Sequence, residues 1–179
     1  KPIRASCLVS KAQFVACHQE RLLQTVDVLK TAAPGATFLL NCVEPATVWE
    51  RLPAHIKKGI VEKKLKFYAL DAYQVAREAE LGPRINTVMM TCYFHITQLL
   101  PGFMDLIKGA IKKSYSAKGE AVVNKNIKAV DGAVSGLIEV HYPTAAVAGG
   151  ELQSMVPAEA PEFVRQVTAE LMAYRGDAL

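Results

Sequence analysis

The sequence predicts an α/β fold built on a parallel sheet, and three short apolar runs carry that prediction. They lie at residues 14–17, 37–41 and 67–72. Each run is continuous rather than alternating, which is typical of parallel strands covered on both faces. Hydrophobic residues between the runs repeat at helical spacing. The order strand, helix, strand, helix, strand favours a parallel sheet with right-handed crossovers.

Two crossover helices are expected between these strands. Pro34-Gly35 is a turn signal that we expect to introduce the second strand. Pro53 should begin a new turn or helix within the second crossover. The helical repeats consist of Leu22, Leu23, Val26 and Leu29 in the first crossover, and Val48, Trp49, Leu52, Ile56 and Ile60 in the second.

Beyond the third strand the pattern is helical. A short helix is expected over residues 75–81, ended by Gly82-Pro83, and Asn86 is expected to cap a helix over 87–100. Apolar residues surround nearly the whole of that second helix, which predicts a central, buried element. Amphipathic helices should follow, one with an apolar stripe at Phe103, Leu106, Ile107, Ala110 and Ile111, and one over residues 119–140.

The C-terminal part changes character. Residues 143–161 show no hydrophobic period and predict a linker or strap. Residues 159–174 are helical again, with an apolar stripe that a single helix cannot bury alone.

Composition excludes several classes of protein. The net charge of +4 is small and dispersed, which argues against nucleic-acid binding. No apolar run approaches the roughly 20 residues of a membrane span. The four cysteines form no Cys-x-x-Cys pair, which indicates a reducing compartment. The absence of Gly-x-Gly-x-x-Gly argues against a stand-alone dinucleotide-binding domain.

Many short blocks in one order resemble the pyruvate:ferredoxin (flavodoxin) oxidoreductase family. The blocks are residues 1–4 (KPIR), 14–18 (FVACH), 38–41 (FLLN), 63–68 (KKLKFY), 82–87 (GPRINT), 114–119 (SYSAKG) and 129–131 (AVD). Two departures stand beside them. The family usually has Ser or Thr, Pro and an aromatic residue where Cys42, Val43 and Glu44 follow Asn41. The motif that family members often show as Gly-Arg-Ile-Asn or Ala-Arg-Ile-Asn appears here as Gly82-Pro83-Arg84-Ile85-Asn86.

The resemblance implies a Rossmann-like, three-layer gamma domain over residues 1–143, lacking its N-terminal part. A linker over 144–158 and a helix over 159–179 that begins the next domain would follow. The implied parent enzyme oxidatively decarboxylates pyruvate, or another 2-oxoacid, with CoA. It uses thiamine pyrophosphate, Mg²⁺ and [4Fe–4S] clusters and passes electrons to ferredoxin or flavodoxin. We expect a homodimeric parent in the cytoplasm, or in a mitochondrion or hydrogenosome if eukaryotic.

This segment is expected to lack catalytic and metal-binding residues and to show no turnover alone. Gly176-Asp177 is followed by Ala178 and does not match the thiamine motif, and the cysteines are too far apart for cluster ligation. The family architecture places the domain near the path of CoA. Arg84 and Asn86, at a predicted helix start, are therefore candidate CoA contacts. The alternative is that Asn86 only caps a helix and Arg84 pairs with a neighbouring domain.

Other reactive residues are weaker candidates. His18 and His95 lack a second ligand at metal spacing and are expected to be structural. Cys92 should be a buried small hydrophobe, whereas Cys17 and Cys42 at strand ends are candidates for accessible thiols. The basic cluster of Lys57, Lys58, Lys63, Lys64 and Lys66 is either a solvated helix face or an attractor for an anionic partner.

Two alternative functions remain beside the leading one. The same domain occurs in the flavin-linked pyruvate:NADP oxidoreductases, whose additional module would lie outside this sequence. A scaffold domain that only holds other modules in place is the second alternative, because a fold does not by itself decide function.

Overall fold

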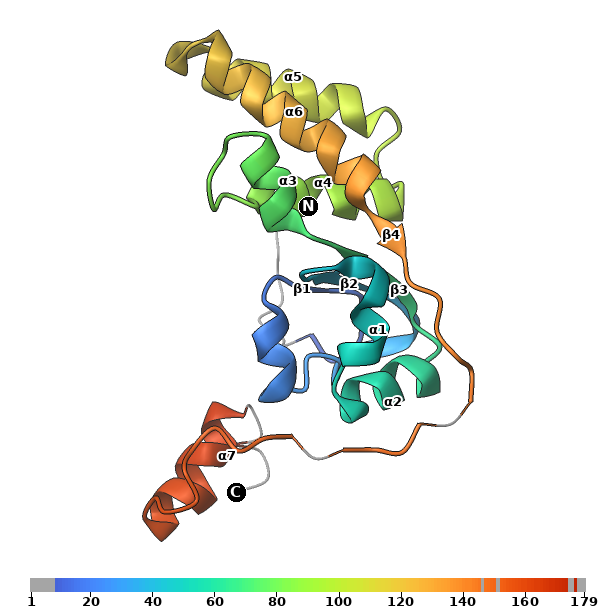
Figure 1. Cartoon of the computed structure of the whole chain (residues 1–179), viewed down its shortest axis with the longest axis vertical. Coiled ribbons are helices and arrows are strands. Elements are labelled where there is room, and N and C mark those ends of the chain that lie inside the picture. The colour runs from blue at the N-terminus through green and yellow to red at the C-terminus, as the bar shows by residue number, and fades with distance from the viewer. Residues whose placement is uncertain (1–8, 146, 151, 174–175, 177–179) are drawn as a thin grey trace. The chain divides into compact units, whose positions relative to one another are not determined.

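Figure 1 shows the computed structural model of the chain, which describes residues 9–145, 147–150, 152–173 and 176. Four strands form one sheet in the order β1-β2-β3-β4. The chain divides into two compact units, one built from parts of residues 1–40, 49–67 and 141–179 and the other from residues 41–48 and 68–140. The predicted α/β class is confirmed.

The first unit contains a parallel pair of strands. β1 (Ala12–Cys17) pairs with β2 (Ala32–Asn41), and Cys17 lies opposite Leu40. The register shifts between Ala12 and Phe14, where β2 bulges. Gly35 lies in this bulge with φ +74°, and its N–H donates to the Lys63 carbonyl at 2.7 Å. The expectation that Pro34-Gly35 precedes the strand was therefore wrong, because a bulge lets glycine remain inside it.

The prediction of a helix between the first and second strands was also wrong. The chain instead forms a 3-10 helix (Glu20–Gln24) and a series of turns. The Asp27 side chain accepts a hydrogen bond from the Leu29 N–H at 3.2 Å, a local bond that competes with helix formation. Leu23 and Leu29 are buried, whereas Leu22 is 40% exposed.

The second crossover follows the prediction. After a 3-10 turn (Pro45–Thr47), it contains α1 (Val48–Arg51) and α2 (Ala54–Glu62), and Pro53 is the N-cap of α2. The fixed φ of proline suits a helix start. Ile56 and Ile60 of α2 are fully buried, and Phe38 stacks on Phe67 with ring centroids 5.3 Å apart.

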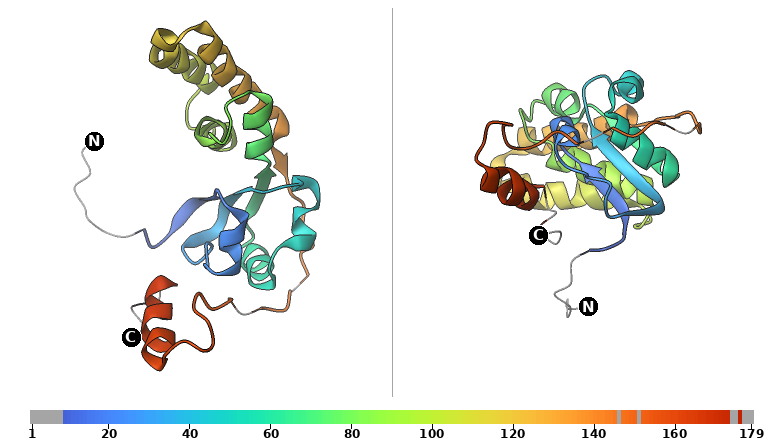
Figure 2. Two further views of the ribbon diagram at one scale, coloured as in Figure 1. Left: turned by 60° about the vertical axis from the view of Figure 1, so that its left-hand side comes forward. Right: turned by 90° about the horizontal axis from the view of Figure 1, so that it is seen from below.

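The second unit is mainly helical. β3 (Lys66–Leu70) leads into α3 (Ala72–Glu78), α4 (Asn86–Thr97) and α5 (Phe103–Tyr115). A 3-10 turn (Ser116–Lys118) and α6 (Glu120–Gly136) follow. α6 contacts α3, α4 and α5, and Figure 2 shows α5 and α6 lying side by side. A Cβ at Gly132 would come within 3.0 Å of Val75, so the glycine permits close packing of α6 on α3.

Two expectations for this unit need correction. The helix predicted over residues 119–140 ends at Gly136, and β4 (Ile138–Glu139) then pairs antiparallel with β3. A two-residue strand is too short to produce a periodic pattern. The third strand also ends at Leu70 rather than residue 72, because Asp71 begins α3 as its N-cap.

α4 was predicted to be a buried helix capped by Asn86, and the structure differs on both points. Its N-cap is Ile85, and Asn86 is the first helical residue. Val88, Met89 and Cys92 are buried, but Met90 is 43% exposed. In α5, the predicted stripe is buried at Phe103, Ile107 and Ile111 and exposed at Leu106 and Ala110.

The segment after β4 is the predicted strap. Its described residues between 141 and 161 contain no helix or strand. The strap is nevertheless attached to the first unit, because the Tyr142 hydroxyl donates to the Leu65 carbonyl at 2.6 Å and its ring stacks on Trp49. The predicted C-terminal helix appears as a π-helical turn (Val164–Thr168) followed by α7 (Ala169–Met172).

Candidate functional site

Ligands of open parallel sheets bind beyond the carboxyl ends of the strands, where Asn41 is the last residue of β2 and Asp71 follows β3. Asn41 is 2% exposed, and its Oδ1 accepts the Ala72 N–H at 2.8 Å. Asp71 Oδ1 accepts the Gln74 N–H at 2.7 Å as the N-cap of α3. Both side chains therefore satisfy free N–H groups at the start of α3, which is a structural task.

A cavity of about 230 Å³ lies beside this strand end within the second unit. The Gln74 amide donates to Glu78 Oε1 at 2.9 Å in its wall. Two carboxylates and no cationic side chain line the cavity, so its charge disfavours a phosphate or diphosphate group. Its lining residues are Pro45, Asp71, Gln74, Val75, Glu78, Gly132, Ser135 and Gly136.

Sequence analysis did not identify this cavity. The missed signal was Asp71 followed by Gln74 three residues later, a spacing close to that of a capping box. The spacing locates the start of α3, from which Gln74 and Glu78 line the wall. Ser135 enters from α6, some 60 positions away along the chain, and no local pattern links it to α3.

A second cavity of about 340 Å³ lies in the first unit, between one face of α2 and the strap. His55 Nε2 is buried there and has no hydrogen-bond partner among the described residues. Lys63 Nζ is engaged by the carbonyls of Leu29 (2.5 Å) and Lys30 (3.1 Å). Lys58 and Glu62 lie 3.8 Å apart. The charges of the lining are mixed, so no class of ligand is favoured.

Three lysines of the basic cluster contact neighbouring groups of the same unit. Lys57 Nζ donates to the Glu50 carbonyl at 3.0 Å and lies 5.8 Å from the Trp49 ring centroid. Together with the contacts of Lys58 and Lys63, this favours the interpretation of a solvated face over that of an anion attractor. Lys64 and Lys66 are exposed.

The expectation that Cys17 and Cys42 are accessible thiols was wrong. Cys17 is 3% exposed and donates to the Gln19 carbonyl at 3.2 Å, and burial raises the pKa of its thiol. Cys42 is 4% exposed. Burial raises the pKa of Cys92 to about 12, in agreement with its predicted place in the core. None of these three thiols is poised as a nucleophile, and Cys7 lies outside the described residues.

The described residues also bring no metal site together, because no three His, Cys, Asp or Glu side chains gather among them. The His95 ring packs edge-on against Phe103 with centroids 5.9 Å apart, which is a structural contact. His18 is exposed just after β1. None of the helices in the described part of the chain is long and apolar enough to cross a membrane.

Arg84 and Asn86 lie at the start of α4. Both are exposed, and among the described residues neither side chain makes a hydrogen bond or ion pair. No side chain caps α4 at Ile85, so no side-chain cap occupies the first N–H groups of the helix. The two residues therefore present a free guanidinium and a free amide next to a positive helix end.

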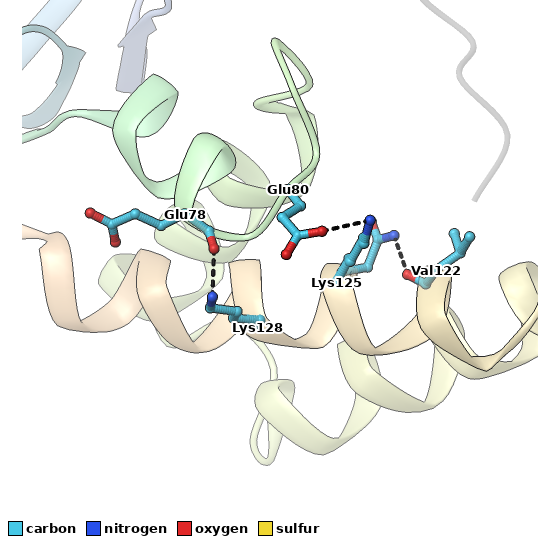
Figure 3. A network of polar contacts seen from close by, with 6 residues as sticks. Glu78, Glu80, Val122, Lys125 and Lys128 are labelled. Carbon is cyan, nitrogen blue, oxygen red and sulfur yellow. Dashed lines mark hydrogen bonds and ion pairs between the residues drawn. The ribbon is translucent and has the colours of Figure 1, made fainter.

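The α3–α4 loop is held in place by α6. Figure 3 shows Lys128 donating to the Glu78 carbonyl at 2.5 Å and Lys125 paired with Glu80 at 2.8 Å. The bond from Lys125 holds the pKa of the Glu80 carboxyl below its ordinary value. These lysines offset the partial negative charge at the C-terminal end of α3. They also hold the beginning of the loop that carries Arg84.

Comparison with known proteins identifies the family. The family profile described as pyruvate ferredoxin/flavodoxin oxidoreductase matches residues 1–136. The chain belongs to this family. A pyruvate-flavodoxin oxidoreductase of Rhodospirillum rubrum is 43% identical over 182 residues, covering 100% of this chain and 15% of that protein. The chain thus spans about a sixth of the length of the curated relatives that it matches.

One further relative by sequence and one solved structure of similar fold complete the comparison. A pyruvate dehydrogenase [NADP(+)] of Cryptosporidium parvum is 35% identical over 211 residues, covering all of this chain and 11% of that protein. The crystal structure of the pyruvate oxidoreductase subunit PORC of Thermotoga maritima matches with a TM-score of 0.57 at 17% identity. That match covers 73% of this chain and 66% of the subunit and supports the α/β fold.

Proposed function

We propose that this chain is part of an oxidoreductase that converts pyruvate and CoA to acetyl-CoA and CO2. Two electrons leave each pyruvate and pass to ferredoxin or flavodoxin. The match of the family profile to residues 1–136 carries this proposal. The complete enzyme would be a cytoplasmic homodimer, or would lie in a mitochondrion or hydrogenosome if the source is eukaryotic.

The reaction chemistry is assigned to other parts of the larger polypeptide. Thiamine pyrophosphate with Mg²⁺ would supply the carbanion chemistry, and [4Fe–4S] clusters would accept electrons singly. The separate burial of Cys17, Cys42 and Cys92 supports this assignment, because cluster ligands must converge. The described residues fit neither group, so the role of this segment is structural, with one contact to a substrate.

That contact is with CoA, through Arg84 and Asn86. A guanidinium matches the geometry of phosphate oxygens, and the uncapped start of α4 adds free N–H groups and a positive dipole end. The finding that Ile85 is the N-cap weakens the alternative in which Asn86 serves only as a cap. Pairing of Arg84 with a neighbouring domain remains the competing interpretation.

Substitution in the complete enzyme tests the CoA contact. Arg84→Ala should raise the KM for CoA about tenfold or more, the equivalent of one lost charge-assisted hydrogen bond, and leave the KM for pyruvate unchanged. Arg77→Ala, at an exposed arginine of α3, is the matched control. Equal KM values for CoA in the two variants would favour the domain-pairing interpretation.

The parent enzyme is tested by the intact mass and cofactor content of the native polypeptide that carries this sequence. A mass several times 19.5 kDa with thiamine pyrophosphate and iron is expected. Bound flavin in addition would favour the NADP-linked alternative, which the similarity to the Cryptosporidium parvum protein supports. A mass near 19.5 kDa without cofactors would instead indicate a scaffold domain.

A further inference from the structure

The turn between α4 and α5 exposes three leucines. Leu99 is 61% exposed, Leu100 is 40% exposed and Leu106 is 56% exposed. We call these three residues the leucine corner. Gly102, with φ +67°, makes the turn, and the Leu106 N–H donates to its carbonyl at 3.2 Å. Figure 1 shows this turn linking the two helices.

The sequence around the leucine corner lacks the charges of a solvated surface. From Asn86 to Ile107 it contains one carboxylate, Asp105, and no lysine or arginine. α4 is rich in apolar residues, and its exposed positions are Asn86 and Met90, the latter 43% exposed. Helices that face water normally carry charged residues on that side. An uncharged outer face is typical of a surface that another protein segment covers.

The leucine corner is not needed for the core of its own unit. Phe103, Ile107 and Ile111 of α5 already pack with Val123 and Val130 of α6. The part of α5 from Lys108 onward, by contrast, carries three lysines and the middle of α6 carries two, and Lys108 pairs with Asp131 at 2.7 Å. The charge pattern therefore changes within α5, from a beginning whose one charged residue is Asp105 to an end that carries three lysines.

We infer that the leucine corner is buried against an apolar, uncharged surface of the same enzyme polypeptide, formed by residues outside this segment. This inference rests on the proposed function. The chain spans only 15% of its Rhodospirillum rubrum relative, so most of such a polypeptide lies outside it. A covalently connected segment loses little translational freedom on docking, so three leucines are sufficient. A stable contact between separate copies needs about 1,600 Å² of buried surface, far more than this corner offers.

Cysteine labelling in the complete native enzyme tests the inference. Leu99→Cys and Leu106→Cys introduce thiols in the corner, and Ser114→Cys places one at the exposed end of α5 as the matched control. Site-specific maleimide labelling is read by peptide mass spectrometry, so native cysteines do not interfere. Labelling at 99 and 106 should be at least about tenfold slower than at 114, with equal rates after unfolding. Equal rates in the native enzyme overturn the inference.

Photocrosslinking from position 106 identifies the occupant. Crosslinks to peptides outside residues 1–179 of the same polypeptide support the inference. Crosslinks to this segment, in the same copy or a second one, overturn it. Mass and pyruvate oxidation are measured on the same preparation. A large, active enzyme with a freely labelled corner contradicts only this inference, whereas an inactive 19.5 kDa protein contradicts the proposed function as well.

Discussion

α4 and α6 are both long helices of the second unit and pack on each other, but their outer faces differ. α6 carries Lys125 and Lys128, which hold the end of α3, and Asp131, which binds Lys108. α4 carries no lysine, arginine or carboxylate. Contacts within this chain therefore engage three charged residues of α6, whereas the exposed positions of α4, Asn86 and Met90, carry no charge. On the inference above, the adjoining leucine corner is covered by a surface outside the segment.

The largest expected difference in stability is between alanine substitutions at two neighbouring residues of α5. Ile107 is 6% exposed within the core, so Ile107→Ala should lower the free energy of unfolding by about 2–5 kcal/mol. Leu106 is 56% exposed, so Leu106→Ala should change it by no more than about 0.5 kcal/mol in this chain. Urea denaturation of both variants measures the difference. A large loss for Leu106→Ala would mean that the chain itself already covers the leucine corner.

A smaller difference in stability is expected between alanine substitutions at the starts of α3 and α4. Asp71 caps α3 through a side-chain hydrogen bond, so Asp71→Ala should cost about 1 kcal/mol. Asn86 is not the cap of α4, so Asn86→Ala should leave the stability unchanged or raise it by about a few tenths of a kcal/mol, because alanine has the higher helix propensity. Thermal unfolding followed by circular dichroism compares the two variants. Equal losses would show that Asn86 contributes to α4 as the sequence first predicted.

The smallest effect concerns the ion pair between Lys125 and Glu80. Lys125 lowers the pKa of the Glu80 carboxyl in the folded state from its ordinary value of 4.5. The ion pair therefore stabilises the fold above pH 4.5. This contribution is lost as the pH falls through the lowered pKa of the folded state. Glu80→Gln should therefore lower the Tm slightly at neutral pH and leave it unchanged in strong acid. Glu78→Gln is the control, because Lys128 binds the backbone carbonyl of Glu78. A Tm difference for Glu80→Gln that persists in acid would contradict this account.

The strands could be predicted where burial on both faces left a continuous apolar run, as at Phe38–Leu40 in β2. β4 could not, because its two residues follow directly from α6. The first crossover was mistaken for a helix because Leu22 and Leu23 match its period, although turns satisfy the same spacing. These failures occur where a local hydrogen bond or a distant strand decides the structure, and neither leaves a periodic signal.

The candidate site was less predictable than the fold. The two cavities are formed by residues from distant segments, and the sequence contains no signal that joins Ser135 to Asp71. Asn41 and Asp71 were found by their place at the carboxyl ends of predicted strands, but their bonds to α3 show a structural task. The CoA contacts at Arg84 and Asn86 stay a prediction, which Arg84→Ala tests.

Trp49 makes the first unit separately observable by fluorescence. It is the only tryptophan of the chain, and its ring lies 5.2 Å from that of Tyr142 in the strap, with Lys57 5.8 Å from its centroid. Its emission therefore reports whether the strap is docked, whereas the ellipticity of the long helices reports mainly on the second unit. If heating shifts the two signals at different temperatures, the units unfold independently, and the stability of one can be adjusted without that of the other.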